Sequence, residues 1–263
     1  MGWSERQIAM LGEMGIRVWS SPDVAEPPSA PAEVVQASAP VAAAPAMRQA
    51  VSPPQAQPGS RPLGIETMGW PALREAVAGC TACTLCSSRR QTVFGVGNER
   101  AHWMIVGEAP GEQEDREGEP FVGKSGQLLD NMLRAVGLTR GEAASESQVY
   151  IANTLKCRPP GNRNPEPAEL AQCEPFLIRQ IALVQPRIIL AMGRFAVQSL
   201  LRSTEPIGRL RGRVHQYQGV PLIVTYHPAY LLRNPEDKAR SWDDLCLARE
   251  VLAQSQQTQQ SPG

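Results

Sequence analysis

The sequence predicts a three-layer α/β domain with a central, mostly parallel four-stranded sheet, because short apolar runs alternate with segments of helical periodicity. Each run is β-branched or almost continuously apolar, which is typical of strands buried on both faces. The four runs are 102–106, 149–152, 187–191 and 222–225. The helical patterns that alternate with them cover 128–136, 167–184, 194–201 and 241–253.

Each apolar run is followed by a residue suited to ending a strand. Gly107, Asn153 and Gly193 follow the first three runs, and His227 with its neighbouring proline follows the fourth. The carboxyl ends of parallel strands meet at one edge of a sheet, where such folds bind their ligands. We therefore expect these four segments to converge on one site.

Composition divides the chain into four parts. No aromatic residue occurs between Trp19 and Trp70, and a segment rich in Ala, Pro and Ser buries too little apolar surface to offset its ordering entropy. Ahead of it lies a short amphipathic pattern that indicates either a docking peptide or a helix folding back onto its own domain. The parts are a docking peptide at 1–19, a disordered linker at 20–65, a folded domain at 66–254 and a polar tail at 255–263.

The charge balance argues against a protein that coats nucleic acid non-specifically, because 26 basic residues match 26 acidic ones. Local basic clusters, such as Lys156, Arg158 and Arg163, favour contact with a few phosphates at one face. An ordinary solvated surface is the alternative. The sequence has neither a secretory leader nor an apolar stretch of membrane-spanning length, so we expect a cytoplasmic monomer.

Four cysteines indicate a metal site. Cys80 and Cys83 form a C-x2-C pair, and Cys157 and Cys173 form a wider C-x15-C pair. Four thiolates suffice for a [4Fe-4S] cluster or for one zinc ion. The wide, proline-rich second pair favours a cluster, because small zinc modules usually use two short pairs.

Two plainer interpretations remain for the cysteines. They could be buried structural residues, which are common, whereas disulfides fit a reducing compartment poorly. Cys86 is either a spare ligand or a packing residue, and Cys246 lies on a helical pattern as a core residue.

The loop after the first strand predicts an oxygen-binding pocket. It reads Gly107-Glu-Ala-Pro-Gly-Glu-Gln-Glu-Asp115 and matches neither a dinucleotide fingerprint nor a P-loop. Its glycines allow backbone N–H groups to point inward, and Glu108 and Glu114 bring carboxylates nearby. An acidic surface turn is the alternative.

Three further residues are candidates for binding a flat polar ligand. Phe121 lies between a proline and a glycine-rich turn, a setting that suits a stacking ring, although core packing is equally compatible. Asn153 offers both a donor and an acceptor to a heterocycle. His227 ends a strand before proline, which favours function over a structural role.

Together these motifs resemble the family 4 uracil-DNA glycosylases, the iron–sulfur-containing bacterial and archaeal type. The resemblance covers about Trp70 to Leu252 and keeps the family's order. It is carried by the C-x2-C pair, the loop from Gly107 to Asp115, Pro120-Phe-Val-Gly123, Asn153-Thr-Leu-Lys-Cys-Arg-Pro-Pro160, Cys173 and His227-Pro-Ala-Tyr-Leu-Leu232.

The resemblance implies a uracil pocket at the strand ends and a [4Fe-4S] cluster on the four paired cysteines. Phe121 would stack on uracil, Asn153 would read its amide edge, and His227 would hydrogen-bond O2. The backbone of Gly107, Glu108 and Ala109 would complete this site.

The water nucleophile is less well defined by the resemblance, because Ala109 stands where other glycosylase families of this superfamily place an aspartate. Glu108 and Glu114 are the candidates for positioning the water or stabilising the sugar cation. The predicted DNA contacts are Lys156, Arg158, Arg163, Tyr230, Leu231 and Arg233.

Residues 1–19 resemble the N-terminal peptide of the psi subunit of the bacterial replicative clamp loader, which implies a replication partner. Two other classes of function compete with the glycosylase. A redox carrier would explain the cysteines but not the strand-end residues, and a tethered adaptor would make 1–19 the active part.

Overall fold

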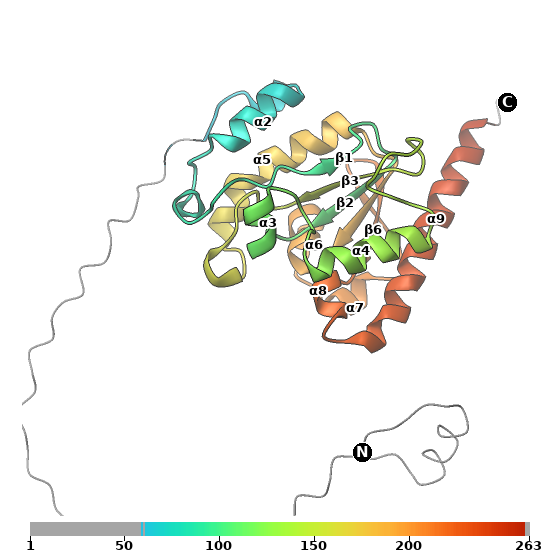
Figure 1. Cartoon of the computed structure of the whole chain (residues 1–263). Coiled ribbons are helices and arrows are strands. Elements are labelled where there is room, and N and C mark those ends of the chain that lie inside the picture. Colours follow the sequence, from blue (N-terminus) through green and yellow to red (C-terminus); the bar gives the residue numbers. More distant parts are fainter. Residues whose placement is uncertain (1–58, 60, 261–263) are drawn as a thin grey trace, which may run out of the picture. The chain divides into compact units, whose positions relative to one another are not determined.

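The computed structural model describes Gly59 and residues 61–260. The predicted docking peptide at 1–19 and nearly all of the predicted linker at 20–65 lie outside these residues. The described part forms an α/β domain in which helices cover both faces of one sheet (Figure 1).

The sheet of the described residues has six strands in the order β1-β3-β2-β4-β6-β5. The four predicted strands are confirmed as its centre, and they run parallel. They are β2 (Trp103–Gly107), β3 (Val149–Asn153), β4 (Ile188–Met192) and β6 (Val220–Thr225).

The prediction of four strands omitted two short edge strands. Both are antiparallel to their neighbours, β1 (Val96–Gly97) to β3 and β5 (Val214–Tyr217) to β6. A strand of two residues carries no readable alternation, and β5 alternates between half-buried and exposed residues instead of forming an apolar run.

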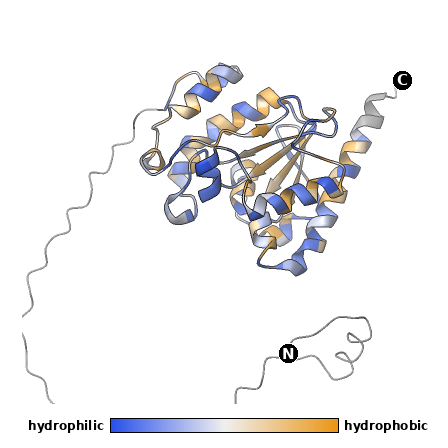
Figure 2. Cartoon of the chain, viewed as in Figure 1, coloured by the Kyte–Doolittle hydropathy of each residue, from blue (hydrophilic) through white to orange (hydrophobic). Residues whose placement is uncertain are grey.

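Two helices cover each face of the sheet. On one face α5 (Pro167–Val184) and α6 (Arg194–Leu201) pack against side chains such as Val106 and Ile189. On the other, α4 (Lys124–Ala135) and α9 (Lys238–Gln260) pack against side chains such as Ile105 and Leu190. The apolar character of the strands between these layers is visible in Figure 2. These two cores fix the sheet, and hence the edge at which its strands end.

The remaining helices are short. The acidic stretch predicted as a loop contains α3 (Glu112–Glu117), so that only residues 108–111 connect β2 to a helix. The last helix, α9, runs through residues 255–260 of the predicted tail, which contain neither Gly nor Pro to stop it. The others are α2 (Trp70–Ala78), α7 (Ile207–Leu210), α8 (Pro228–Leu231), η1 (Ile65–Thr67), η2 (Thr84–Ser87), η3 (Pro160–Asn162) and η4 (Pro235–Asp237).

A third apolar cluster joins α2 and α5 to the segment that leaves β3. Its fully buried members are Leu73, Val77, Leu85, Leu155 and Phe176, and Cys157 and Cys173 lie within it. In the described part of the chain, no helix combines the length and apolar character needed to cross a bilayer.

Candidate active site

A cleft of about 880 Å³ opens at the carboxyl ends of the parallel strands. Segments that follow β2, β3, β4 and β6 all contribute to its walls, as expected for an open parallel sheet. The structure brings most of the predicted site residues together there. The predicted residues that line the cleft are Glu108, Ala109, Glu114, Phe121, Asn153, Arg163, His227, Tyr230 and Arg233.

Gly107 and Asn153 occupy the last paired positions of β2 and β3 and lie side by side. A Cβ atom at Gly107 would clash with Asn153 Oδ1 and approach Phe121 Cζ at 2.6 Å. Asn153 is 2% exposed, and its Oδ1 atom has no hydrogen-bond partner. A buried carbonyl oxygen without a donor is costly, so this atom is suited to accept a hydrogen bond from a ligand.

Phe121 lies in a strained turn beside Asn153. Its φ of 56° is in the left-handed region that non-glycine residues rarely adopt. The turn needs Gly126, because a Cβ atom there would overlap the Phe121 carbonyl group. The Phe121 and His227 rings are nearly parallel, with centroids 5.3 Å apart and an interplanar angle of 27°. The cleft therefore contains an aromatic surface flanked by polar groups.

His227 caps the N-terminus of α8, and its Nδ1 atom accepts a hydrogen bond of 3.2 Å from Ala229 N. In the neutral ring the proton must then lie on Nε2, which leaves that atom as a donor. Burial, aided by Arg233, lowers the pKa of His227 to about 4, so the ring is neutral near pH 7.

Gly193, with φ of 88°, lies directly behind this histidine. A Cβ atom at Gly193 would lie 3.1 Å from His227 Cβ. The glycine after β4 therefore both makes the left-handed turn and leaves room for the His227 ring.

Glu108 contributes the ionisable carboxyl group with the most perturbed pKa in the cleft. Burial raises the pKa of Glu108 to about 7, and the Arg194 guanidinium opposes that shift. Its backbone is fixed, because Glu108 O accepts hydrogen bonds from Thr154 Oγ1 at 2.5 Å and from Leu155 N at 3.1 Å. A carboxyl group poised near neutral pH in a cleft suits general acid–base chemistry.

Glu114 has a different environment, because its carboxylate is occupied by backbone N–H groups. Oε2 accepts from Gly111 N at 3.1 Å, and Oε1 accepts from Val122 N at 3.1 Å and from Gly123 N at 3.4 Å. The side chain thus ties the loop after β2 to the turn that holds Phe121. This arrangement favours a positioning role for Glu114 over the catalytic role that the sequence suggested.

Two predicted DNA contacts need correction. Lys156 is 1% exposed, because its ammonium group is enclosed by the protein. Leu231 is also 1% exposed, because it points inward from the short helix α8, whereas the next residue, Leu232, is 45% exposed. Arg158 remains partly exposed, and it donates to Asn162 Oδ1 at 2.7 Å and pairs with Glu112 at 3.5 Å.

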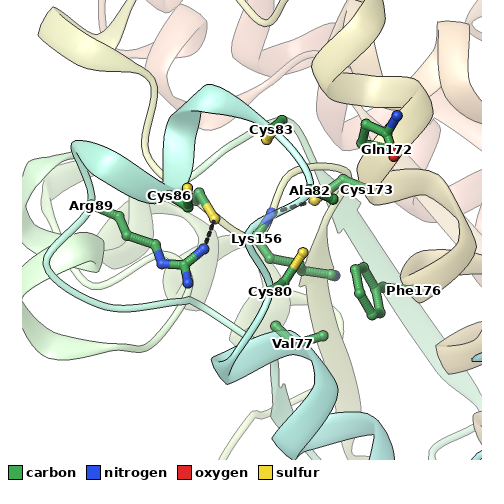
Figure 3. A pocket seen from close by; sticks show the side chains of 11 residues that line it. Val77, Cys80, Ala82, Cys83, Cys86, Arg89, Lys156, Gln172, Cys173 and Phe176 are labelled. Atoms are coloured by element: carbon green, nitrogen blue, oxygen red, sulfur yellow. Dashed lines mark hydrogen bonds between the residues drawn. The ribbon is translucent and has the colours of Figure 1, made fainter. Parts of the chain in front are cut away.

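The predicted metal-binding cysteines line one small pocket. Figure 3 shows Cys80, Cys83, Cys86 and Cys173 around it, and Cys157 completes the cysteine lining. The other residues that line the pocket are the apolar Val77, Ala82 and Phe176 and the polar Arg89, Lys156 and Gln172.

Two of the sulfur atoms already accept hydrogen bonds. Arg89 Nη1 lies 3.0 Å from Cys157 Sγ, and Lys156 N lies 3.3 Å from Cys173 Sγ (Figure 3). Burial raises the pKa of Cys157 to about 11 and that of Cys173 to about 12. Buried thiols of this kind become thiolates when a metal supplies the compensating charge.

In the described chain, no group of three or more His, Cys, Asp or Glu side chains is arranged so that it could hold a metal ion directly. The donor set nevertheless fits a sulfur-ligated group. Five cysteines, two N–H donors to sulfur and apolar walls are features that hold and tune such a group.

The comparisons with known proteins agree with this geometry. The family model described as the uracil DNA glycosylase superfamily matches residues 94–246. The fold, with its cleft at the strand ends, is therefore that of a uracil-DNA glycosylase, a hydrolytic enzyme of DNA repair.

Curated relatives define the branch of that superfamily. The type-4 uracil-DNA glycosylase of Archaeoglobus fulgidus is 39% identical over 190 residues, which are 69% of this chain and 92% of the relative. That of Pyrobaculum aerophilum is 40% identical, covering 66% and 90%. That of Thermotoga maritima is 42% identical, covering 63% and 84%. The chain belongs to the type-4 uracil-DNA glycosylase family.

Three residues of the two sites escaped the sequence analysis. Arg89 contacts Cys157 across 68 positions of sequence, a separation that no local pattern reveals. Tyr226 stacks on Tyr230 at the cleft, with centroids 4.9 Å apart. Arg194, which faces Glu108, is the first residue of the helix after β4, and its position at a strand end was the available signal.

Proposed function

We propose that the enzyme flips deoxyuridine out of DNA into the strand-end cleft and hydrolyses its N-glycosidic bond, releasing uracil and leaving an abasic site. A base inside a duplex is inaccessible to side chains, so extrusion must precede the chemistry. The observation that carries this proposal is the unpartnered, buried Asn153 Oδ1 beside the Phe121 ring.

Base recognition follows from the groups around Asn153. Its Oδ1 atom accepts the N3–H of uracil, and the amide nitrogen donates to O4. Cytosine lacks the N3–H and carries an amino group at position 4, so it leaves both groups of Asn153 mismatched. The base stacks on Phe121, and the missing side chain at Gly107 leaves space for it.

Bond cleavage follows from His227. As the C1′–N1 bond breaks, its electron pair stays with uracil and negative charge collects on O2. The neutral Nε2–H of His227 donates a hydrogen bond to O2, and the backbone N–H groups of the loop after β2 add to this stabilisation. Because the ring is neutral, it stabilises the leaving anion as a hydrogen-bond donor and not as an imidazolium.

Water completes the reaction at the sugar. The sugar becomes cationic at C1′, where the oxygen of a water molecule attacks. We assign Glu108 to orient this water and accept its proton, because position 109 holds an alanine instead of an aspartate and Glu114 is occupied by backbone contacts. The products are uracil and an abasic sugar that carries the new hydroxyl group.

DNA is held at the rim of the cleft. Arg163 and Arg233 contact phosphates, with Arg158 beside them, and Tyr230 lies along the path of the strand. Leu232 replaces Leu231 as the residue that fills the gap left by the flipped base, because Leu232 alone of the two is exposed.

Cys80, Cys83, Cys157 and Cys173 hold a [4Fe-4S] cluster in this proposal. When bound, the cluster cross-links the segment before β1 to the segment after β3 and to α5. Support comes from the sulfur-rich pocket and its N–H donors. Iron and acid-labile sulfide analysis of purified protein tests it, since a zinc site would contain neither.

We also propose that residues 1–19 dock onto a component of the replicative clamp loader, on the strength of their sequence pattern alone. The test is capture of purified clamp loader by the full chain compared with a chain that lacks residues 1–19. Equal capture by both chains would refute the docking role.

Cleavage of a labelled oligonucleotide that contains one deoxyuridine tests the proposed activity, with alkali to reveal abasic sites and a thymidine oligonucleotide as control. We expect cleavage at uracil alone and a rate about 10²-fold to 10³-fold lower for His227→Ala. An iron-loaded wild-type protein that leaves uracil intact would refute the proposal and favour a redox carrier.

A further inference from the structure

Lys156 is a buried cation that lies between the two sites. Its side chain is 1% exposed and lines the cysteine pocket (Figure 3). Its Nζ atom donates to Asn153 O at 2.7 Å and to Gln180 Oε1 at 2.7 Å. Lys156 therefore contacts the backbone of the base-reading residue from inside the protein.

The same residue contacts the cysteine site through its backbone. Lys156 N donates to Cys173 Sγ at 3.3 Å, and Cys157 is the next residue in the chain. Five residues, 153–157, thus connect the base pocket with the sulfur atoms. This segment also holds the loop after β2, because Thr154 N donates to Gly107 O at 3.0 Å and Leu155 N donates to Glu108 O at 3.1 Å.

In the described chain, neither hydrogen-bond partner of Lys156 compensates its charge. Both of its hydrogen-bond acceptors in the described chain are neutral oxygen atoms. Burial disfavours the charged form of a lysine, and an opposite charge nearby offsets that cost. Cys157 and Cys173 line the same pocket as Lys156, and those residues carry negative charge when they ligate a metal cluster.

Gln180 makes the network rigid. Its Nε2 atom donates to Phe94 O at 2.9 Å and to the Tyr150 hydroxyl at 3.2 Å, and the side chain is fully buried. Because each end of the Gln180 amide is engaged, the oxygen that faces Lys156 is fixed in place. The ammonium group therefore has little freedom to leave Asn153.

We propose that Lys156 is a positioning residue that couples the cysteine site to the base pocket. Its charge compensates the thiolates of the filled cysteine site, and its hydrogen bond fixes the backbone that presents Asn153 to the base. This proposal rests on the proposed [4Fe-4S] cluster and on uracil excision by the same pocket.

Lys156→Met removes both the charge and the donor at nearly constant side-chain length. We expect the reduction potential of the cluster, measured by protein-film voltammetry, to move to more negative values, because a nearby positive charge favours the added electron. We also expect kcat/KM on the deoxyuridine oligonucleotide to fall about 10-fold, since Asn153 O loses its donor. Lys238→Met is the matched control, because Lys238 is exposed on α9, and it should change neither quantity.

Arg89→Met separates the two roles. In the described chain Arg89 donates to Cys157 Sγ and to Ala78 O, both away from Asn153, so its removal should lower the potential without changing the preference for uracil over cytosine. If Lys156→Met shifts neither the potential nor kcat/KM, the proposed coupling is overturned.

If the Lys156→Met protein fails to fold or to hold iron, Gln180→Glu tests the role of the positive charge on Lys156. The new carboxylate would lie next to Nζ and neutralise the ammonium while keeping a hydrogen bond to it. A lower potential supports the proposal, and an unchanged potential overturns it. Wild-type protein measured in parallel separates this result from the proposed function, since absent iron or intact uracil in the wild type would refute that function instead.

Discussion

The two ends of the segment 153–157 contrast in how their buried polar groups are satisfied. At the cysteine end, Cys157 Sγ accepts a hydrogen bond from Arg89, and Cys173 Sγ accepts one from the backbone of Lys156. At the other end, Asn153 Oδ1 is buried without any donor. A segment of five residues thus joins a site with two hydrogen-bonded sulfur atoms to a site with an open acceptor.

The proposed function explains this contrast by two kinds of ligand. A resident group can stay in place after folding, so the protein can surround it with fixed donors. A substrate binds and dissociates in each catalytic cycle, so the protein atom that hydrogen-bonds to it must be unpaired in the free enzyme. The strained backbone of Phe121 lies beside Asn153, at the cleft end of this segment. Such strain lowers the stability of the fold and is common where a site is preorganised for a ligand.

The contrast predicts that loss of one cysteine ligand damages the whole fold. Cys173→Ala should abolish iron binding and lower the free energy of unfolding by about 3 kcal/mol or more, because the cross-link between α5 and the segment after β3 disappears. Iron analysis and chemical denaturation measure the two effects.

Two other cysteines serve as controls for this variant. Cys246→Ala, on α9, and Cys86→Ala, in the cysteine pocket itself, should each retain iron. If Cys86→Ala lost the iron and Cys173→Ala kept it, the assignment of ligands would be wrong.

Within the base pocket, Glu108 should control the pH dependence of the reaction. Its raised pKa, about 7, means that the active carboxylate form is lost as the pH falls through 7. We expect kcat/KM to fall about 10-fold per pH unit below 7, and Glu108→Gln to lower it about 10²-fold and abolish this limb of the profile. His227, with its pKa near 4, stays neutral over this range.

A rate that rises as the pH falls would indicate that Glu108 acts as an acid and contradict its assignment. Steady-state rates between pH 5 and pH 8, on a substrate without other titrating groups, decide between the two roles.

The smallest effect should come from the glycine behind His227. Gly193→Ala should cost about 1–2 kcal/mol of stability from its left-handed backbone, and it should also slow cleavage several-fold by displacing the His227 ring. Gly137→Ala shares the positive φ, but no atom lies within 4 Å of the added Cβ, so it should lose stability alone. Equal rates for the two variants would show that Gly193 does not position His227.

The residues that line the strand-end cleft were largely predictable from the sequence, because their position depends on topology. Apolar runs identified the four parallel strands, and residues directly after them, such as Asn153 and His227, had to meet at one edge. The side-chain directions were less accessible. Leu231 is the last residue of the short helix α8 and Leu232 is its C-cap, and the two side chains differ in burial. The amino-acid sequence alone does not determine where such a short helix begins, and so which leucine points inward.

That the cysteines come together was predictable from the sequence, but their surroundings were not. The sequence predicts that Lys156 is a surface residue, because basic residues and prolines follow it closely in the chain. Its burial depends on Gln180, which lies 24 positions away on α5. Partners at such separations follow from packing, which local periodicity does not encode.

The most direct measurement is the single-turnover rate at which iron-loaded Asn153→Leu protein releases uracil from a deoxyuridine oligonucleotide, with wild-type protein alongside. We predict normal iron content and a rate about 10³-fold lower, because the buried acceptor that would read the base is gone. An iron-loaded variant that cleaves at the wild-type rate would contradict the assignment of this pocket to base reading.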